Sequence, residues 1–191
     1  MAFTLSLPAP RSPFNRDGLA WWYEHELGWA TAAGDGGGPV ELLTGLRFDV
    51  LELPAAAGFA VLRRVGGRWP VALAGQRMRL LVAAGATDEL PGLLDWLEWG
   101  GIALDLVALG AGDRTTAPIP PGWSGSGSPG AASWLRPPEP GREVEPSLPA
   151  MPAVGGVVGA PCLVRLVDAA ASECHRVRLL GADRTQRLAS S

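Results

Sequence analysis

Apolar and polar residues along this chain follow two periods, and the period separates predicted helices from predicted strands. Apolar residues three or four positions apart predict helices over residues 17–27, 55–65, 87–100 and 161–180. Short apolar or alternating runs predict strands over residues 39–44, 47–53, 70–74, 77–83, 102–109 and 131–136. Gly75 and Gln76, which separate two of these runs, predict a tight hairpin. The mixture predicts an α+β fold in which helices pack on a mixed or antiparallel sheet.

The length of 191 residues suits one folded domain of about 130–150 residues with additional tails. Proline and glycine cluster in a few segments and do not recur with a fixed period, which excludes collagen-like and solenoid folds. The pattern therefore predicts a lead-in at 1–16, an α+β domain at 17–136, a Pro/Gly-rich linker at 137–160, a C-terminal helix at 161–180 and a flexible tail at 181–191.

The charged residues restrict the chemistry that this chain can perform. All 16 basic residues are arginine, a usage typical of a high-GC genome, and the absence of lysine excludes Schiff-base lysines and phosphate-loop lysines. The formal net charge is −3 and the sequence pI is about 5.4, so nucleic acid is not attracted by the chain as a whole. Any binding of nucleic acid has to be local.

The sequence predicts a cytoplasmic protein that does not associate with a membrane. Its first residues lack a basic segment followed by a long apolar run, and no later segment offers about 18 uninterrupted apolar residues. Cys162 and Cys174 are twelve positions apart in one predicted helix, a distance of roughly 18 Å, which is too long for a disulfide. We therefore expect two free thiols, as in a reducing compartment.

Arginines gather without acidic residues between positions 55 and 87 of this acidic chain. The set consists of Arg63, Arg64, Arg68, Arg77 and Arg79. Together with Trp69, these side chains could contact phosphates and stack on a base, so we predict a nucleic-acid or nucleotide site at an arginine-rich face. The alternative interpretation is that the arginines only solvate one sheet face and one helix end.

Several short strings, in order along the chain, resemble the N-terminal domain of bifunctional DNA primase/polymerases. GPVELLTGLRFDVLELP (38–54) is similar to the apolar strand, Thr-Gly turn and acid-bearing strand of that family. GQRMRLLV (75–82) resembles the later strand that holds a Gly-Arg-His element. GGIALDLVALGAGDRTTAPIPPG (100–122) and ASWLRPP (132–138) resemble the closing Asp-bearing strand, the Pro-rich turn and a Trp-containing strand. The resemblance covers about residues 20–138 and implies a split α+β unit related to RNA-recognition folds.

The resemblance implies nucleotidyl transfer assisted by two divalent metals, which requires clustered oxygen ligands. Glu52 stands at the first acid of the family's acid-x-acid motif, but Pro54 occupies the second. Met78 stands near the expected histidine, and Asp105 could represent the third acid. Asp49 is the other carboxylate of the early strand, and its three-residue separation from Glu52 predicts that the two point to opposite faces. We therefore predict a degenerate site with no catalytic residues, in which Glu52, Asp49 and Asp105 are vestigial.

The two histidines and four of the tryptophans offer further candidates. His25 and His175 belong to no metal-binding spacing, so we predict no metal site and no cofactor; Mg²⁺ or Mn²⁺ would be needed only by an active enzyme. The tryptophans at helical spacing are Trp21, Trp22, Trp96 and Trp99. They are interpreted as core residues, with an apolar patch for a partner as the alternative.

Three functional hypotheses follow from these patterns. The first is a non-catalytic primase/polymerase-like module that binds nucleic acid, a nucleotide or a protein partner. The second is an active nucleotidyltransferase whose metal ligands come from other positions, such as Asp49 with Asp105. The third is a protein-interaction scaffold with no role in nucleic-acid binding. The spatial arrangement of the three carboxylates and the five arginines separates these hypotheses.

Overall fold

A computed structural model describes residues 16–34, 38–123, 131–152 and 162–189 of the chain. Within these ranges the helices are α1 (Arg16–Glu26), α2 (Ala55–Val65), α3 (Ala86–Trp96), the 3-10 helix η2 (Glu145–Ser147) and α4 (Leu163–Ala189). The strands are β1 (Thr31–Gly34), β2 (Gly38–Leu43), β3 (Asp49–Pro54), β4 (Val71–Ala74), β5 (Arg77–Val82), β6 (Val107–Leu109), β7 (Arg114–Thr116) and β8 (Ser133–Arg136). None of the described helices is both long enough and apolar enough to cross a membrane.

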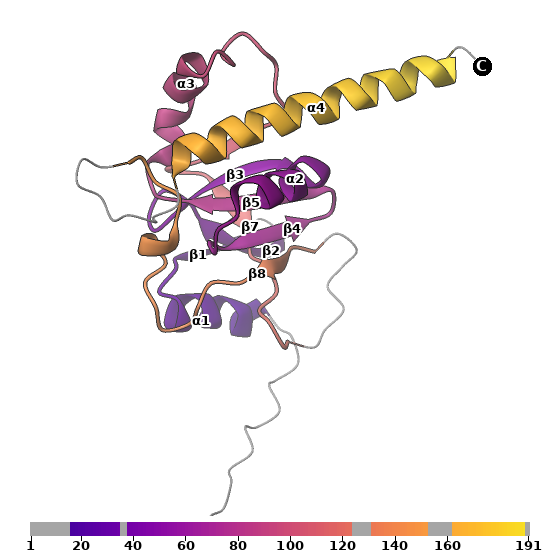
Figure 1. The fold of residues 1–191 in the computed structure, drawn as a ribbon. Coiled ribbons are helices and arrows are strands. Elements are labelled where there is room, and N and C mark those ends of the chain that lie inside the picture. The colour runs from indigo at the N-terminus through magenta and orange to yellow at the C-terminus, as the bar shows by residue number, and fades with distance from the viewer. Residues whose placement is uncertain (1–15, 35–37, 124–130, 153–161, 190–191) are drawn as a thin grey trace, which may run out of the picture.

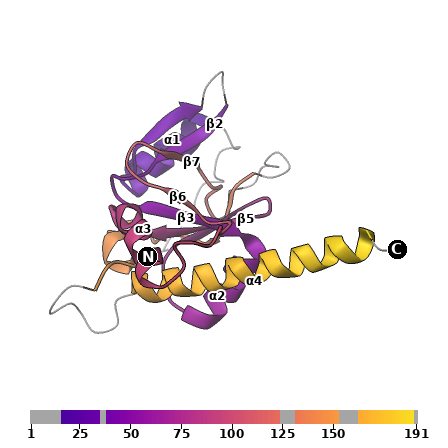
Figure 2. The same ribbon diagram turned by 90° about the horizontal axis from the view of Figure 1, so that it is seen from above.

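The strands form two antiparallel sheets. The larger sheet has the order β6-β3-β5-β4-β8, and the smaller has the order β1-β2-β7. Helices α2 and α4 cover one face of the larger sheet, while the smaller sheet and α1 lie on its other side (Figures 1 and 2). The predicted α+β class, with an antiparallel sheet packed by helices, is confirmed. The hairpin predicted at Gly75 and Gln76 joins β4 to β5 as expected.

Strand β3 lies in the interior of the larger sheet and buries apolar side chains on both of its faces. Leu51 and Leu53 are buried on one face, and Val50 is buried on the other, where the two sheets meet. An aromatic cluster fills the space beneath the smaller sheet, with Trp29 and Phe48 ring centroids 4.5 Å apart. The two sheets therefore share one core.

Tyr23 of α1 ties the helix to this core through its hydroxyl group. The hydroxyl donates a hydrogen bond to the carbonyl oxygen of Pro118 at 2.7 Å and accepts one from Trp134 Nε1 at 2.9 Å. Burial raises the pKa of Tyr23 well above its usual value, although the hydrogen bond from Trp134 opposes the shift. The hydroxyl is satisfied as a neutral donor and acceptor, as a buried polar group requires.

One predicted strand near α4 is shorter in the structure. The strand predicted over residues 102–109 is limited to Val107–Leu109. The carbonyl groups of the residues before β6 accept hydrogen bonds from side chains of α4 and not from a neighbouring strand. Cys174 Sγ lies 3.6 Å from the Asp105 carbonyl oxygen, and Arg178 donates to the Ala103 carbonyl oxygen at 2.6 Å. These tertiary contacts have no signal in the local apolar pattern.

The segment predicted as a linker packs against the domain where it is described. Val144 and Leu148 are buried on either side of η2, and the carbonyl oxygen of Pro149 accepts a hydrogen bond from the backbone N–H of Ala83. Apart from the 3-10 helix η2 and an isolated bridge at Ala150, residues 137–152 have no regular structure, as predicted, but they pack against the domain and do not act as a free linker; residues 153–160 lie outside the described residues. Proline disfavours helices and strands in this segment, but it does not prevent the burial of apolar side chains such as Val144 and Leu148.

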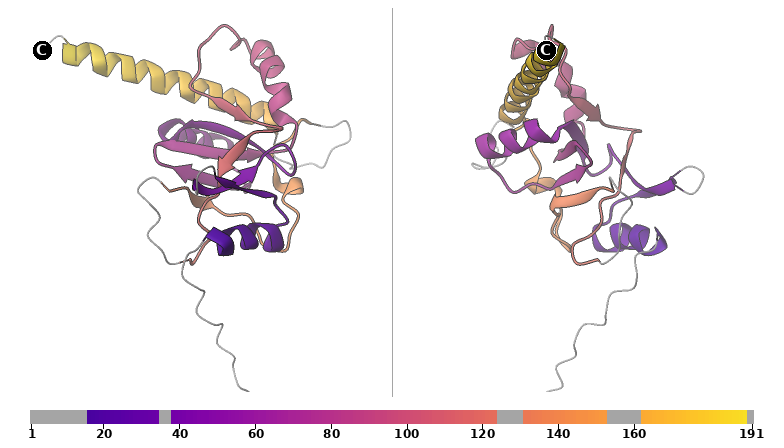
Figure 3. Two further views of the ribbon diagram at one scale, coloured as in Figure 1. Left: turned by 180° about the vertical axis from the view of Figure 1, so that it is seen from behind. Right: turned by 90° about the vertical axis from the view of Figure 1, so that its right-hand side faces the viewer.

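Helix α4 continues to Ala189, past the end predicted at Leu180, so residues 181–189 are not an irregular tail. A glycine inside a helix costs only about 1 kcal/mol relative to alanine, which is too little to end a long helix at Gly181. The C-terminal half of α4 extends beyond the edge of the sheet (Figures 1 and 3). Leu179 and Leu180 on this part are more than half exposed.

Two of the four tryptophans interpreted as core residues lie on the surface. Trp21 is 53% exposed and Trp96 is 72% exposed. Helix α3 buries Leu90 and Leu93 but ends at Trp96. The apolar face of the helix therefore does not extend far enough to bury the Trp96 side chain in the core. The prediction of a core role is therefore wrong for Trp21 and Trp96.

Cys162 and Cys174 are both free, as their spacing predicted. Cys174 is buried on α4, and burial, followed by the charge of nearby Asp105, raises its pKa to about 12. We expect iodoacetamide at about pH 8 to modify the partly exposed Cys162 and to spare Cys174, because only the thiolate reacts. Above about pH 8.5, stability should fall as pH rises, because the unfolded chain ionises Cys174 first.

The reaction is followed by intact mass and peptide mapping of the native protein. Unfolding in urea before alkylation is the control, and there both cysteines should react. Equal rates for the two cysteines in the native protein would contradict the burial of Cys174.

Candidate functional site

Glu52 on β3 lies between two arginines of the neighbouring strand β5. The register places Glu52 opposite Arg79, whose Nε is 2.8 Å from Glu52 Oε2. Arg77 Nε is 3.1 Å from the other carboxylate oxygen, Oε1. The three side chains are largely shielded, with 17%, 15% and 26% of the Glu52, Arg79 and Arg77 side chains exposed. Both oxygens of Glu52 are thus occupied by guanidinium groups.

Arg77 extends this interaction to Asp105, which precedes β6. Its Nη1 is 2.6 Å from Asp105 Oδ1, and its Nη2 donates to the Glu52 backbone carbonyl at 3.3 Å. Burial lowers the pKa of the Arg77 guanidinium, but the hydrogen bonds and negative charges of Asp105 and Glu52 raise it by more, so it lies above its usual value. We call Glu52, Arg77, Arg79 and Asp105 the ion-pair cluster, in which two positive and two negative charges balance.

Asp49 lies on the opposite face of β3 and is fully buried near α3. Its Oδ2 accepts hydrogen bonds from the backbone N–H of Thr87 at 3.0 Å and from Thr87 Oγ1 at 2.8 Å. The predicted separation of Asp49 and Glu52 onto opposite faces is confirmed. The N-cap of α3 is Gly85, and Asp49 supplies a carboxylate to the first turn of the helix.

The three carboxylates singled out in the sequence are therefore not brought together as a ligand set. Asp49 is held on the helical face by Thr87, whereas Asp105 pairs with Arg77 beside Glu52. Among the residues that the structure describes, no three His, Cys, Asp or Glu side chains gather closely enough to hold a metal ion. In the ion-pair cluster, the negative charges of Glu52 and Asp105 are balanced by Arg77 and Arg79.

The five arginines predicted to share one face lie in different surroundings. Arg77 and Arg79 belong to the ion-pair cluster, and Arg64 pairs with Asp168 of α4 at 3.2 Å. Arg63 and Arg68 are exposed, and in the described ranges neither has a hydrogen-bond or ion-pair partner. The prediction of one arginine-rich face is wrong. Three of the five arginines pair with acidic residues that lie outside positions 55–87 in the sequence.

Trp69 is a core residue and cannot stack on a base as the sequence suggested. Only 1% of it is exposed, and the guanidinium of Arg136 lies 5.8 Å from its ring centroid. Gly67 makes this placement possible: it has φ +103°, and a Cβ there would be 1.7 Å from the Trp69 ring. The chain thereby turns Trp69 inward and leaves Arg68 on the surface.

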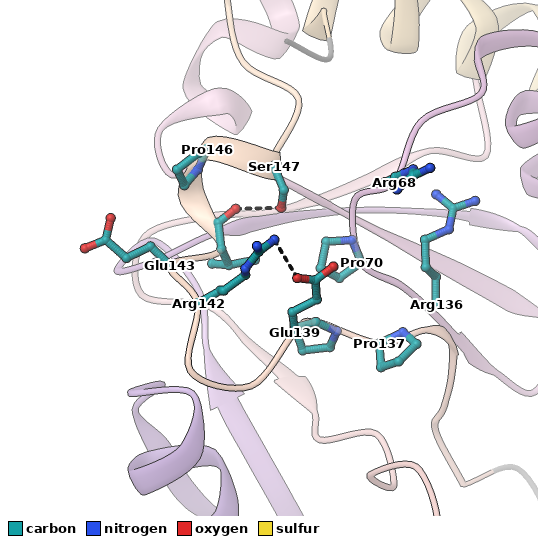
Figure 4. A pocket seen from close by; sticks show the side chains of 11 residues that line it. Arg68, Pro70, Arg136, Pro137, Glu139, Arg142, Glu143, Pro146 and Ser147 are labelled. Carbon is teal, nitrogen blue, oxygen red and sulfur yellow. Dashed lines mark hydrogen bonds and ion pairs between the residues drawn. The ribbon is translucent and has the colours of Figure 1, made fainter. Parts of the chain in front are cut away.

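A cavity of about 560 Å³ opens where Arg68 emerges, between the β4–β8 edge of the larger sheet and residues 137–147. Arg68 and Arg136 lie at one end, and the ion pair of Arg142 with Glu139, 2.9 Å long, lies toward the other (Figure 4). Proline rings, including that of Pro70, line the space between them. The cavity thus has two positive side chains at one end, an ion pair toward the other, and rigid apolar walls between them.

Sequence reasoning identified Arg68 but missed the other charged residues of this cavity. Arg136, Glu139 and Arg142 fall at the end of β8 and in the segment interpreted as a linker. The available signal was the spacing of Val144 and Leu148 within that segment, two apolar residues that could anchor it to a core. The pairing of β8 with β4 places Arg136, and burial of Val144 and Leu148 holds the segment that carries Glu139 and Arg142 against the domain.

Comparisons of the chain with protein-family models, with curated proteins and with solved structures found no match. The resemblance to primase/polymerase domains therefore remains a prediction from short sequence strings and element order.

Proposed function

We propose that this chain is a non-catalytic, primase/polymerase-like module of the cytoplasm that binds a nucleic acid or nucleotide through arginine side chains. The observation that best supports the proposal is the occupation of both Glu52 carboxylate oxygens by Arg77 and Arg79. Two-metal nucleotidyl transfer needs carboxylates that converge on the ions. A carboxylate held by two guanidinium groups is instead satisfied by its protein partners.

The binding role is supported by the arginines that are not paired with acids. Arg68 is exposed and has no ion-pair or hydrogen-bond partner in the described ranges. The guanidinium of Arg136 donates to the Trp69 carbonyl oxygen and lies against the Trp69 ring, and among the described residues it pairs with no acid. Guanidinium groups of this kind bind phosphate oxygens through paired hydrogen bonds. Because the chain carries a net charge of −3, such binding would be confined to this local region.

We expect no template-dependent incorporation of labelled nucleotide on a primed template with Mg²⁺ or Mn²⁺, whereas a single-stranded oligonucleotide should bind. The affinity should fall as salt increases, with a log–log slope of roughly −1.4 to −2.1 for two or three phosphate contacts on a single strand. Primer extension and fluorescence anisotropy at several salt concentrations measure the two properties. Incorporation that disappears in Glu52→Ala or Asp105→Ala would overturn the proposal and favour an active enzyme.

A protein-interaction scaffold is a second candidate, and the exposed apolar side chains favour it. Trp96 is 72% exposed at the end of α3, and Leu179 and Leu180 are exposed on the projecting part of α4. Large exposed apolar residues are common where proteins contact partners. Absence of salt-dependent oligonucleotide binding would favour this candidate over the first.

A further inference from the structure

We infer that the cavity between the β4–β8 edge and residues 137–147 is a site for one nucleoside monophosphate unit, an inference that rests on the proposed function. In the sheet order β6-β3-β5-β4-β8, the cavity lies at the β8 edge, while Glu52 and Asp105 lie toward the β6 edge. Strands in a sheet are about 4.8 Å apart, so the two places are distinct. This site therefore does not use the carboxylates of the ion-pair cluster.

Arg68 and Arg136 form the end of the cavity that would hold the phosphate group. Arg136 is fixed in place, because its Nη1 donates to the Trp69 carbonyl oxygen at 3.2 Å and its guanidinium lies against the Trp69 ring. Arg68 is exposed and has no partner in the described ranges, and the two guanidinium groups lie on the same side of the cavity (Figure 4). Two such groups offer the paired N–H donors that match phosphate oxygens.

The middle of the cavity offers a rigid apolar surface for a flat ring. Pro70 and Pro138 are buried in its wall, and Pro137 and Pro146 complete the lining. Proline rings have few internal degrees of freedom, so packing against them costs little conformational entropy. The volume of about 560 Å³ lies in the range of roughly 300–1,000 Å³ typical of small-molecule sites.

The Glu139–Arg142 pair at the other end explains why one nucleotide unit fits better than a longer polyanion. It presents one acceptor and one donor, which a base edge with an amino group and a ring nitrogen can match. Arg142 offsets the charge of Glu139, and Glu143, which points away from the cavity (Figure 4), adds one further negative charge at this end. A triphosphate or a strand running through the cavity would bring phosphates close to these acids.

The ligand could be a free nucleotide or the phosphorylated end of a strand, since both present the same chemical group. Isothermal titration of the full chain with AMP, adenosine, inorganic phosphate, ATP and two oligonucleotides, with and without a 5′-phosphate, separates these sources. We expect AMP to bind more tightly than adenosine, phosphate or ATP. A strand end is the source if the 5′-phosphorylated oligonucleotide binds more tightly than AMP.

Arg68→Ala should weaken AMP binding about tenfold or more, because it removes a charge-assisted hydrogen bond. Arg165→Ala, which removes an exposed arginine of α4, is the matched control and should change the affinity less than twofold. Arg68 has no partner in the described ranges, so its removal should leave the thermal unfolding midpoint unchanged. Arg136→Lys keeps the charge but loses the planar group, and it should also weaken binding.

Equal AMP affinity for the wild type and Arg68→Ala would overturn the inference, as would tighter binding of ATP than of AMP. If a single-stranded oligonucleotide binds but AMP does not, this site is wrong while the proposed function stands. If neither binds, both the site and the nucleotide-binding role are wrong.

Discussion

Trp69→Ala is expected to lower the free energy of unfolding by about 3–5 kcal/mol, the usual cost of removing a buried large aromatic side chain. The indole is 1% exposed and also supports the guanidinium of Arg136, so the variant loses apolar burial and leaves a void. Urea unfolding followed by far-ultraviolet circular dichroism measures the change. Trp96→Ala is the matched control, and because Trp96 is 72% exposed we expect a change within about 0.5 kcal/mol.

A second substitution separates the aromatic packing of Trp69 from its polar group. The Nε1 of Trp69 is buried and has no hydrogen-bond partner among the described residues. Trp69→Phe should therefore be less destabilising than Trp69→Ala, because no hydrogen bond is lost. Full stability of Trp69→Ala combined with loss of oligonucleotide binding would contradict the core assignment and restore a base-stacking role.

Glu52→Ala is expected to lower the free energy of unfolding by about 2–4 kcal/mol. Removing one partner of a shielded ion pair leaves the other charge without compensation, and here both Arg77 and Arg79 lose their carboxylate. The same urea titration measures the loss. As a control, Arg142→Ala breaks a pair whose side chains are 76% and 71% exposed, and it should cost less than about 1 kcal/mol.

The direction of the Glu52 effect distinguishes the two interpretations of this residue. In a cluster of like-charged metal ligands, removing one carboxylate from the ion-free protein relieves repulsion and raises stability. In the ion-pair cluster, the same removal lowers stability. A stabilised Glu52→Ala variant would therefore contradict the proposal that Glu52 serves as the partner of two arginines.

Local patterns predicted those elements whose stability depends on nearby residues. The β4–β5 hairpin has its turn at Gly75, and α2 follows the end of β3 at Pro54. The positions of this glycine and this proline in the sequence indicated both boundaries. Strands β1 and β7 were missed, because their short sequences, TAAG and RTT, show no apolar alternation. Each is held by pairing with β2, which is a tertiary contact.

The candidate site was predicted less completely than the fold, since its charges are paired over long sequence distances. Arg77 and Arg79 have no acidic neighbour in the sequence, and their carboxylate partner precedes them by 25 and 27 residues. Arg136 reaches the cavity because β8 pairs with β4, and Glu139 lies in the segment in which Val144 and Leu148 are buried. Neither arrangement leaves a periodic signal in the chain.

The amino-acid sequence by itself determined the α+β class, the opposite directions of Asp49 and Glu52 and the separation of the two thiols, because these follow from backbone periods that act over a few residues. The tertiary structure alone decided which arginines are neutralised and which remain available, and that Trp69 is buried. Charge pairing and burial depend on distances in space, and folding sets these distances between residues far apart in the chain.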